Sequence, residues 1–283
     1  MKTAQHPVLP FTISFDPCRH RYTDNEGSRY ISGTAFVKQF FTPFDAPAAA
    51  ARVGARTGRP AAELEAEWKA KGEATADYGT RLHAYAEARV LGVPESPAFD
   101  PADERARKVV DAALSALEKQ YEFLGAEQIV FDPLYLVAGS IDLPMRNRET
   151  GAICVADWKT IRDVSDDNYG KFGLPPIEHI PDSKRVHCGL RLSLYGELML
   201  GSGYLPDGTE VETAVIHVPQ GCSEPTWIPL PFVRDEIQAM LTQYHETQDW
   251  VARVTGGGGK DTSLNRGAAA LLDQRPNLEA LPF

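Results

Sequence analysis

The chain has 283 residues, of which 43% are hydrophobic and 24% are charged, and its formal net charge is −10. This length and apolar content allow one large domain or two small ones with a substantial core. No run is long and apolar enough to span a bilayer, and the polar opening MKTAQHPVLPF lacks the apolar core of a signal peptide. We therefore expect no membrane partner. The negative charge does not by itself indicate nucleic-acid binding, although local basic clusters would still permit it.

The cysteines are far apart in the sequence and form no C-x-x-C pair; they are Cys18, Cys154, Cys188 and Cys222. This spacing argues against a zinc ribbon or a disulfide framework. Reduced, scattered cysteines are typical of the cytoplasm, so we expect a cytoplasmic protein.

The first half of the chain is expected to be helical after an opening of short strands. Those strands lie around a turn at residues 24–27. Helices are expected after it in four segments: about 34–42, stopped before Pro43, then about 46–58, 61–92 and 101–124. Gly72 and Thr75 interrupt the apolar stripe of the third segment, and a break into two helices near them is expected as an alternative.

The second half changes to a β-rich pattern. We predict three antiparallel strands at about 126–132, 134–144 and 152–159, the last two joined by a turn at 147–151. A polar loop, a helix at about 184–201, two strands (ETAVIHVP and TWIPLP) and a helix at about 233–254 follow. The order predicts a mixed α+β fold in residues 1–255, with a central mixed, largely antiparallel sheet flanked by helices. Residues 256–283 begin with four glycines and are predicted to be a flexible linker and tail.

Asp157 and Lys159 end a strand-like run, GAICVADWKT. Side chains at i and i+2 of a strand share a face, so these two charges stand together and Trp158 points the other way. For the tripeptide alone, a surface ion pair at a strand end is the better explanation, because D-x-K arises often by chance. Asp142, in VAGSIDL, changes this judgement, since pairing through the 147–151 turn brings it near Asp157.

Two close carboxylates are unfavourable unless a positive charge neutralises them. Mg²⁺ prefers carboxylate and water oxygens, and a lysine beside it can orient or deprotonate water or stabilise charge on a phosphate. Gly139 and Ser140, just before Asp142, would let a backbone or a ligand approach closely.

Four motifs, in this order, resemble the PD-(D/E)xK nuclease superfamily, in particular its RecB-type exonuclease branch of phage and recombination systems. YGTRLH followed by Glu87 resembles the G-x-x-x-H-x-x-x-E helix, and GSID resembles the strand with the first metal aspartate. DWKT resembles the D-x-K core, and RLSLY resembles the Q-x-x-x-Y helix. RHRYTDNEGSRYISGTAF also resembles a segment that opens many phage members, so the resemblance covers most of residues 20–200. It implies a restriction-endonuclease-like core.

The resemblance also implies roles for individual residues. Asp142, Asp157 and Lys159 would be catalytic, and one or two Mg²⁺ or Mn²⁺ ions would be held by His83, Asp142, Asp157 and the Trp158 backbone carbonyl. Supporting or DNA-contacting roles would fall to Glu87, Glu127, Ser140, Thr160, Arg191 and Tyr195. Glu127 is explained equally well as a strand-edge charge. For Tyr195, which would contact DNA or brace the site, the alternative is simple helix packing.

The chain departs from the family pattern in two places. Arg191 stands where the family has glutamine, so either arginine grips phosphate here or the alignment is shifted by one helical turn. The cysteine cluster of the iron–sulfur members is missing, and we expect no iron–sulfur centre.

These features predict a metal-dependent deoxyribonuclease, with exonuclease action favoured, acting on single- or double-stranded DNA ends in recombination, repair or phage DNA metabolism. Its location would be the cytoplasm of a bacterial or phage-infected cell. One alternative is a catalytically weak DNA-binding subunit of a recombination or defence complex, and the intact Asp142, Asp157 and Lys159 argue against it. Another is a metal hydrolase of small phosphodiesters.

The end of the chain, NLEALPF, resembles the acidic tail of bacterial single-stranded-DNA-binding proteins, which docks on genome-maintenance partners. A replication or recombination protein is therefore a candidate partner. Packing of Leu281 and Phe283 on their own domain is the favoured alternative.

Overall fold

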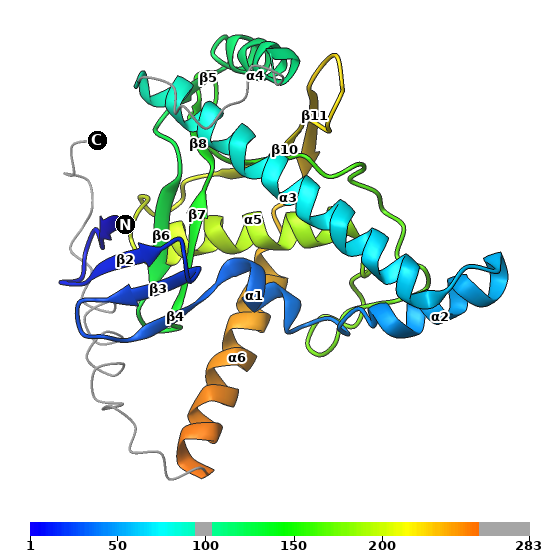
Figure 1. The fold of residues 1–283 in the computed structure, drawn as a ribbon. Helices are drawn as coiled ribbons and strands as arrows, with labels where there is room; N and C mark the ends of the chain where they lie inside the picture. The colour runs from blue at the N-terminus through cyan, green and yellow to red at the C-terminus, as the bar shows by residue number, and fades with distance from the viewer. Residues whose placement is uncertain (94–103, 255–283) are drawn as a thin grey trace.

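The computed structural model describes residues 1–93 and 104–254, with side chains up to residue 248. The predicted linker and tail, and the docking role suggested for them, lie outside these ranges. The described part has a mixed α/β fold with a six-stranded and a five-stranded sheet (Figure 1). The prediction of one central sheet is therefore wrong, while the mixed composition is confirmed. Within the described residues, no helix combines the length and the apolar character needed to cross a membrane.

The six-stranded sheet has the order β1-β2-β3-β4-β7-β6. Its strands are β1 (Lys2–Gln5), β2 (Thr12–Asp16), β3 (Arg21–Asp24), β4 (Arg29–Ser32), β7 (Val137–Ile141) and β6 (Gln128–Asp132). The predicted turn at 24–27 is present, because Asp24 Oδ1 accepts from the Ser28 N–H at 2.7 Å and Gly27 has a φ of 85°. Strand β1 lies in the polar opening, for which we make no prediction from the sequence.

The five-stranded sheet has the order β11-β10-β9-β8-β5. Its strands are β11 (Thr226–Leu230), β10 (Val211–His217), β9 (Ile153–Lys159), β8 (Leu143–Asn147) and β5 (Tyr121–Phe123). Strands β9 and β10 are parallel and the other pairs are antiparallel, as expected for a mixed, largely antiparallel sheet. The 147–151 turn is present, with the Gly151 N–H donating to the Asn147 carbonyl at 2.9 Å.

The predicted strand at 134–144 is divided at Asp142. Its first part is β7 in the six-stranded sheet, and its second part is β8 in the five-stranded sheet. Asp142 is the residue between them, and its Oδ2 accepts from the Trp158 N–H of β9 at 2.9 Å. The chain thus passes from one sheet to the other at the residue that the sequence singles out.

The helices are α1 (Gly33–Lys38), α2 (Ala46–Thr57), α3 (Ala61–Leu91), α4 (Glu104–Leu117), α5 (Lys184–Gly201) and α6 (Arg234–Val254). The alternative of a break near Gly72 and Thr75 is wrong, because α3 is continuous and Thr75 Oγ1 donates to the Lys71 carbonyl at 2.8 Å. Helix α4 ends before the predicted residue 124, since residues 121–123 form β5 instead.

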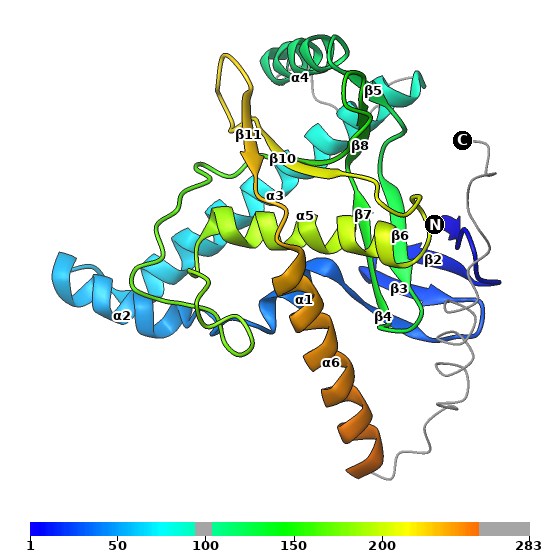
Figure 2. The ribbon, with the colours of Figure 1, turned by 180° about the vertical axis from the view of Figure 1, so that it is seen from behind.

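Helix α5 joins the two sheets. It packs against β6 and β7 of one sheet, β9 and β10 of the other, and α6 (Figure 2). Leu194 of α5 is fully buried in a cluster that also holds Val137 of β7 and Val155 of β9. Apolar burial of this kind, about 1.5–3 kcal/mol per large side chain, fixes the sheets relative to each other.

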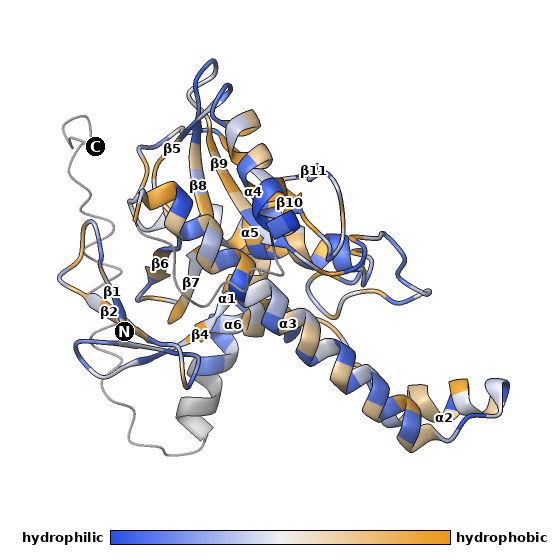
Figure 3. Ribbon diagram, turned by 45° about the horizontal axis from the view of Figure 1, so that its top comes forward, coloured by the Kyte–Doolittle hydropathy of each residue, from blue (hydrophilic) through white to orange (hydrophobic). Residues whose placement is uncertain are grey.

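Helix α2 and the first half of α3 extend away from the sheets as a helical arm (Figures 1 and 2). Asp45 caps α2 by accepting from the Ala48 N–H at 2.9 Å, and Gly58 ends it with a left-handed φ of 72°. Figure 3 shows hydrophilic residues alternating with weakly hydrophobic ones on this part of α3, whereas β9 is mostly hydrophobic. The second half of α3 buries Tyr78, Leu82 and Tyr85, which holds it on the body of the protein.

We expect Gly139→Ala to lower the free energy of unfolding by about 2–3 kcal/mol, because the new Cβ would overlap the buried ring of Tyr195. Gly72→Ala is the matched control: its Cβ would meet nothing within 4 Å, and alanine favours the helix by about 1 kcal/mol. Urea denaturation of both variants measures the two effects. A Gly139→Ala variant as stable as the parent would contradict the close approach.

Candidate metal centre

Three predicted residues from distant parts of the chain meet at the junction of the sheets. His83 comes from α3, Glu127 precedes β6, and Asp142 lies between β7 and β8. One potential ligand atom from each lies within 4.8 Å of the others. His83 Nδ1 is 3.3 Å from Asp142 Oδ2 and 3.6 Å from Glu127 Oε1. We refer to His83, Glu127 and Asp142 as the ligand group.

Hydrogen bonds orient each member of the ligand group. His83 Nε2 donates to the Trp158 carbonyl at 3.1 Å, which leaves Nδ1 facing the carboxylates. Ser140 Oγ donates to Glu127 Oε2 at 2.8 Å. Metal-binding histidines commonly use their second nitrogen in this way, which fixes the tautomer and the ring. Metal ligation by the Trp158 carbonyl stays a prediction, since that oxygen keeps a second lone pair.

Glu127 takes its place through an unusual backbone conformation. Its φ is +50°, in the left-handed region that non-glycine residues seldom adopt, and its N–H donates to the Asp142 carbonyl at 3.1 Å. Such conformations persist where surrounding structure holds them and are frequent at functional sites. The conformation places the Glu127 carboxylate beside His83, while its supporting role stays a prediction.

Asp157 lies beside a different set of charges. Its Oδ2 is 2.6 Å from Lys159 Nζ, and its Oδ1 is 2.5 Å from an Arg191 guanidinium nitrogen. The expectation that Asp157 and Lys159 share a face is confirmed by this contact. Among the described residues, Asp157 is not part of the ligand group, because both of its oxygens face cations. Its metal ligation stays a prediction that requires one of these ion pairs to open.

The charges shift the pKa values in opposite directions. Burial, assisted by Asp157, raises the pKa of Asp142 to about 7. Burial lowers the pKa of His83, but the neighbouring carboxylates outweigh it and raise the value to about 9. Burial also raises the pKa of Asp157, but Arg191 and Lys159 outweigh it and hold that pKa well below its usual range. The ligand group therefore favours an added positive charge, which a proton on His83 supplies when no cation is bound.

The donor set suits a hard divalent cation. Two carboxylates are ligands that Mg²⁺ and Mn²⁺ both accept, and the imidazole is a better ligand for Mn²⁺ than for the harder Mg²⁺. The ligand group is partly open, with side-chain exposures of 29% for His83, 20% for Glu127 and 10% for Asp142, so an ion can reach it.

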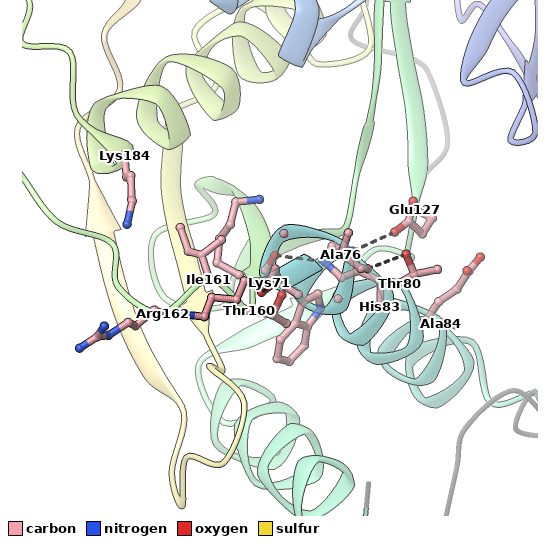
Figure 4. A pocket seen from close by; sticks show the side chains of 16 residues that line it. Lys71, Ala76, Thr80, His83, Ala84, Glu127, Thr160, Ile161, Arg162 and Lys184 are labelled. Atoms are coloured by element: carbon pink, nitrogen blue, oxygen red, sulfur yellow. Dashed lines mark hydrogen bonds and ion pairs between the residues drawn. The ribbon is translucent and has the colours of Figure 1, made fainter. Parts of the chain in front are cut away.

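His83 and Glu127 of the ligand group line a groove of about 920 Å³. Lys159 and Thr160 also line this groove, and their roles beside a substrate stay predictions. In Figure 4, Lys184 and Arg162 lie toward one end of the groove and His83 and Glu127 toward the other. We refer to this space as the basic groove.

Three basic residues of this groove were not predicted: Lys71, Arg162 and Lys184. Lys71 had a signal in the sequence, because Lys71, Thr75, Gly79 and His83 follow one another at steps of four residues, and residues four apart are neighbours on a helix surface. Arg162 and Lys184 flank the long loop between β9 and α5, whose course the sequence does not reveal.

The other predicted residues are placed as follows. Glu87 forms an ion pair with Lys2 of β1 at 2.6 Å, at the rim of the basic groove. Arg191 is held by Asp157, so a grip on phosphate would require that pair to open. Tyr195 is 5% exposed and packs closely on Gly139, so little of its ring is open to DNA, and bracing of the site and simple helix packing both stay open.

Searches of protein-family models and of curated proteins return no match to this chain.

We expect His83→Ala to weaken Mn²⁺ binding by about 10–100-fold, because the variant loses a ligand that Nδ1 aims at the two carboxylates. Activity should fall with it and recover in part at excess Mn²⁺. Isothermal titration with Mn²⁺ measures the affinity, and His179→Ala is the control, since His179 is 65% exposed and contacts Glu236 instead. If the titrations of the His83 variant and the parent superimpose, His83 is not a metal ligand and serves only in packing.

Proposed function

We propose that this protein is a metal-dependent deoxyribonuclease that acts on DNA ends as an exonuclease. The observation that carries the proposal is the shared basic groove: His83 and Glu127 of the ligand group line it with Lys159, and Lys71, Arg162 and Lys184 line it as well. These basic residues gather on a chain whose formal net charge is −10. Phosphate contacts from lysine and arginine position a nucleic-acid backbone, so the clustering supports a polyanionic substrate.

Each residue has a distinct role in the proposed reaction. His83, Glu127 and Asp142 would hold a divalent cation, which supplies charge to polarise a phosphate and to acidify water. Lys159 lies in the same groove with its side chain 18% exposed, where its ammonium orients water or stabilises charge developing on the phosphate. Asp157 and Arg191 fix the position of that ammonium from the buried side.

We further propose membership of the RecB-type branch of the PD-(D/E)xK superfamily, with a restriction-endonuclease-like core and a cytoplasmic role in a bacterial or phage-infected cell. The supporting arrangement is the antiparallel pair of β8 and β9, with Asp142 just before β8 and the D-x-K sequence at the end of β9. Strand β10 lies parallel to β9, and α3 brings His83 to the same end.

Digestion of linear and closed-circular DNA in Mg²⁺ or Mn²⁺, with label at either end, tests the proposal. Loss of the linear form alone, abolished by a chelator, is the result expected of an exonuclease. Metal-dependent binding without cleavage would instead support the DNA-binding subunit. Cleavage confined to a small phosphodiester such as bis(p-nitrophenyl) phosphate would support the small-molecule hydrolase.

A further inference from the structure

A second cavity, of about 530 Å³, adjoins the metal centre on the side of the N-terminal strand. Residues of β1, the start of β6, and Tyr204 line it, among them Lys2, Gln5 and Gln128. Glu87 and Glu127 line both this cavity and the basic groove, so the two spaces meet at the ligand group.

The two spaces follow one another along α3. Lys71 and His83 both line the basic groove and are 12 residues apart, which is about 18 Å of helix. Glu87, about 6 Å beyond His83, is the residue of α3 that reaches the second cavity. A strand bound along α3 would therefore have a long segment before the metal centre and a short one after it.

The ammonium of Lys2 lies at the second cavity and could leave the Glu87 carboxylate to bind a phosphate. Its ammonium is 2.6 Å from Glu87, and the two side chains are 46% and 28% exposed. Exposed ion pairs of this kind contribute little to stability, so a phosphate can displace the carboxylate. Amides of Gln5 and Gln128 and the ring of Tyr204 provide hydrogen-bonding and apolar surface beside it.

We propose that the second cavity binds the nucleotide released from the substrate, with Lys2 on its phosphate. This inference rests on the proposed function and adds a product site to it. A cavity of this volume lies within the range of small-ligand sites and accommodates a nucleoside monophosphate. The longer basic groove holds the rest of the strand, so the protein releases short products from one end.

Binding of deoxyadenosine 5′-monophosphate and 3′-monophosphate to the full chain with Mn²⁺, measured by calorimetry, tests the product site. The protein is prepared for this experiment without an N-terminal tag, because β1 forms one wall of the second cavity. Lys2→Gln should weaken binding of at least one of them by about tenfold, the loss expected for a charged hydrogen bond. Lys69→Gln is the matched control, since Lys69 is 79% exposed and lines neither space. Lys71→Gln should weaken binding of a single-stranded oligonucleotide and leave the mononucleotide unchanged.

A Lys2→Gln variant that binds both mononucleotides within twofold of the parent would overturn the product site. So would an unmodified protein that binds neither of them. DNA digestion is scored separately in the same preparations, so a missing product site is distinguishable from a missing nuclease. If the protein binds a mononucleotide through Lys2 but does not cleave DNA, the nucleotide site is supported and the proposed nuclease activity is contradicted.

Discussion

Lys159→Ala is expected to reduce the single-turnover rate of DNA cleavage by about 10²–10⁴-fold, the range for loss of an acid–base group or a charge-stabilising donor. The Lys159 ammonium reaches the basic groove from the end of β9, beside the ligand group. DNA affinity should stay within about threefold, because Lys71, Arg162 and Lys184 still line the groove. The fold should persist, since Arg191 continues to pair with Asp157.

Single-turnover kinetics and oligonucleotide binding, measured on the same preparations, separate the two effects. Lys71→Ala is the comparison variant: it removes a lysine of the same groove about 18 Å along α3 from His83. That variant should raise the dissociation constant for DNA and reduce its salt dependence, while the rate at saturating DNA changes little. If the Lys159→Ala variant cleaves DNA at a rate near that of the parent, the assignment of the active site to the end of β9 is wrong.

Local patterns predicted much of the fold. The helix at 184–201 and the turn at 147–151 follow from apolar periodicity and turn residues, which depend on near neighbours. The closeness of Asp142 and Asp157 followed from that turn, because the register of a hairpin places both residues. The division of the strand at Asp142 could not be predicted, since β7 and β8 have similar apolar patterns and only their partners differ.

The candidate site was less predictable where it depends on contacts between distant segments. Glu127 joins His83 and Asp142 through a positive φ that nothing in its local sequence demands. The Lys2–Glu87 pair joins residues 85 positions apart, and the strand that carries Lys2 was itself missed. Contacts of this kind are set by how the sheets and helices pack, and no periodicity along the chain encodes them.

The role of Arg191 shows the same limit. The sequence left open whether this arginine grips phosphate or is displaced from the site by one helical turn. The structure places it at Asp157, with its side chain 17% exposed. Here α5 supplies a fixed positive charge to a carboxylate that is 6% exposed. Arg191 therefore neutralises a buried carboxylate of the protein itself. Its removal should lower the free energy of unfolding as well as the activity.

Arg191→Met is expected to lower the free energy of unfolding by about 3 kcal/mol at pH 7 without divalent metal, because it leaves the buried Asp157 charge with Lys159 as its remaining close cation. Methionine keeps much of the side-chain volume, so the change is mainly one of charge. Guanidinium chloride denaturation measures the effect, and Arg56→Met on the exposed side of α2 should change stability by less than about 0.5 kcal/mol.

A double-mutant cycle attributes this loss to the pair itself. In Arg191→Met with Asp157→Asn, both charges are absent and no buried carboxylate is left without its arginine. We therefore expect the double variant to be more stable than the sum of the single losses predicts, with a coupling of about 1–3 kcal/mol. Strict additivity would mean that the two residues do not interact in solution. Asp157 would then be free to join the ligand group, and a second metal ion would become the better explanation of its place beside Lys159.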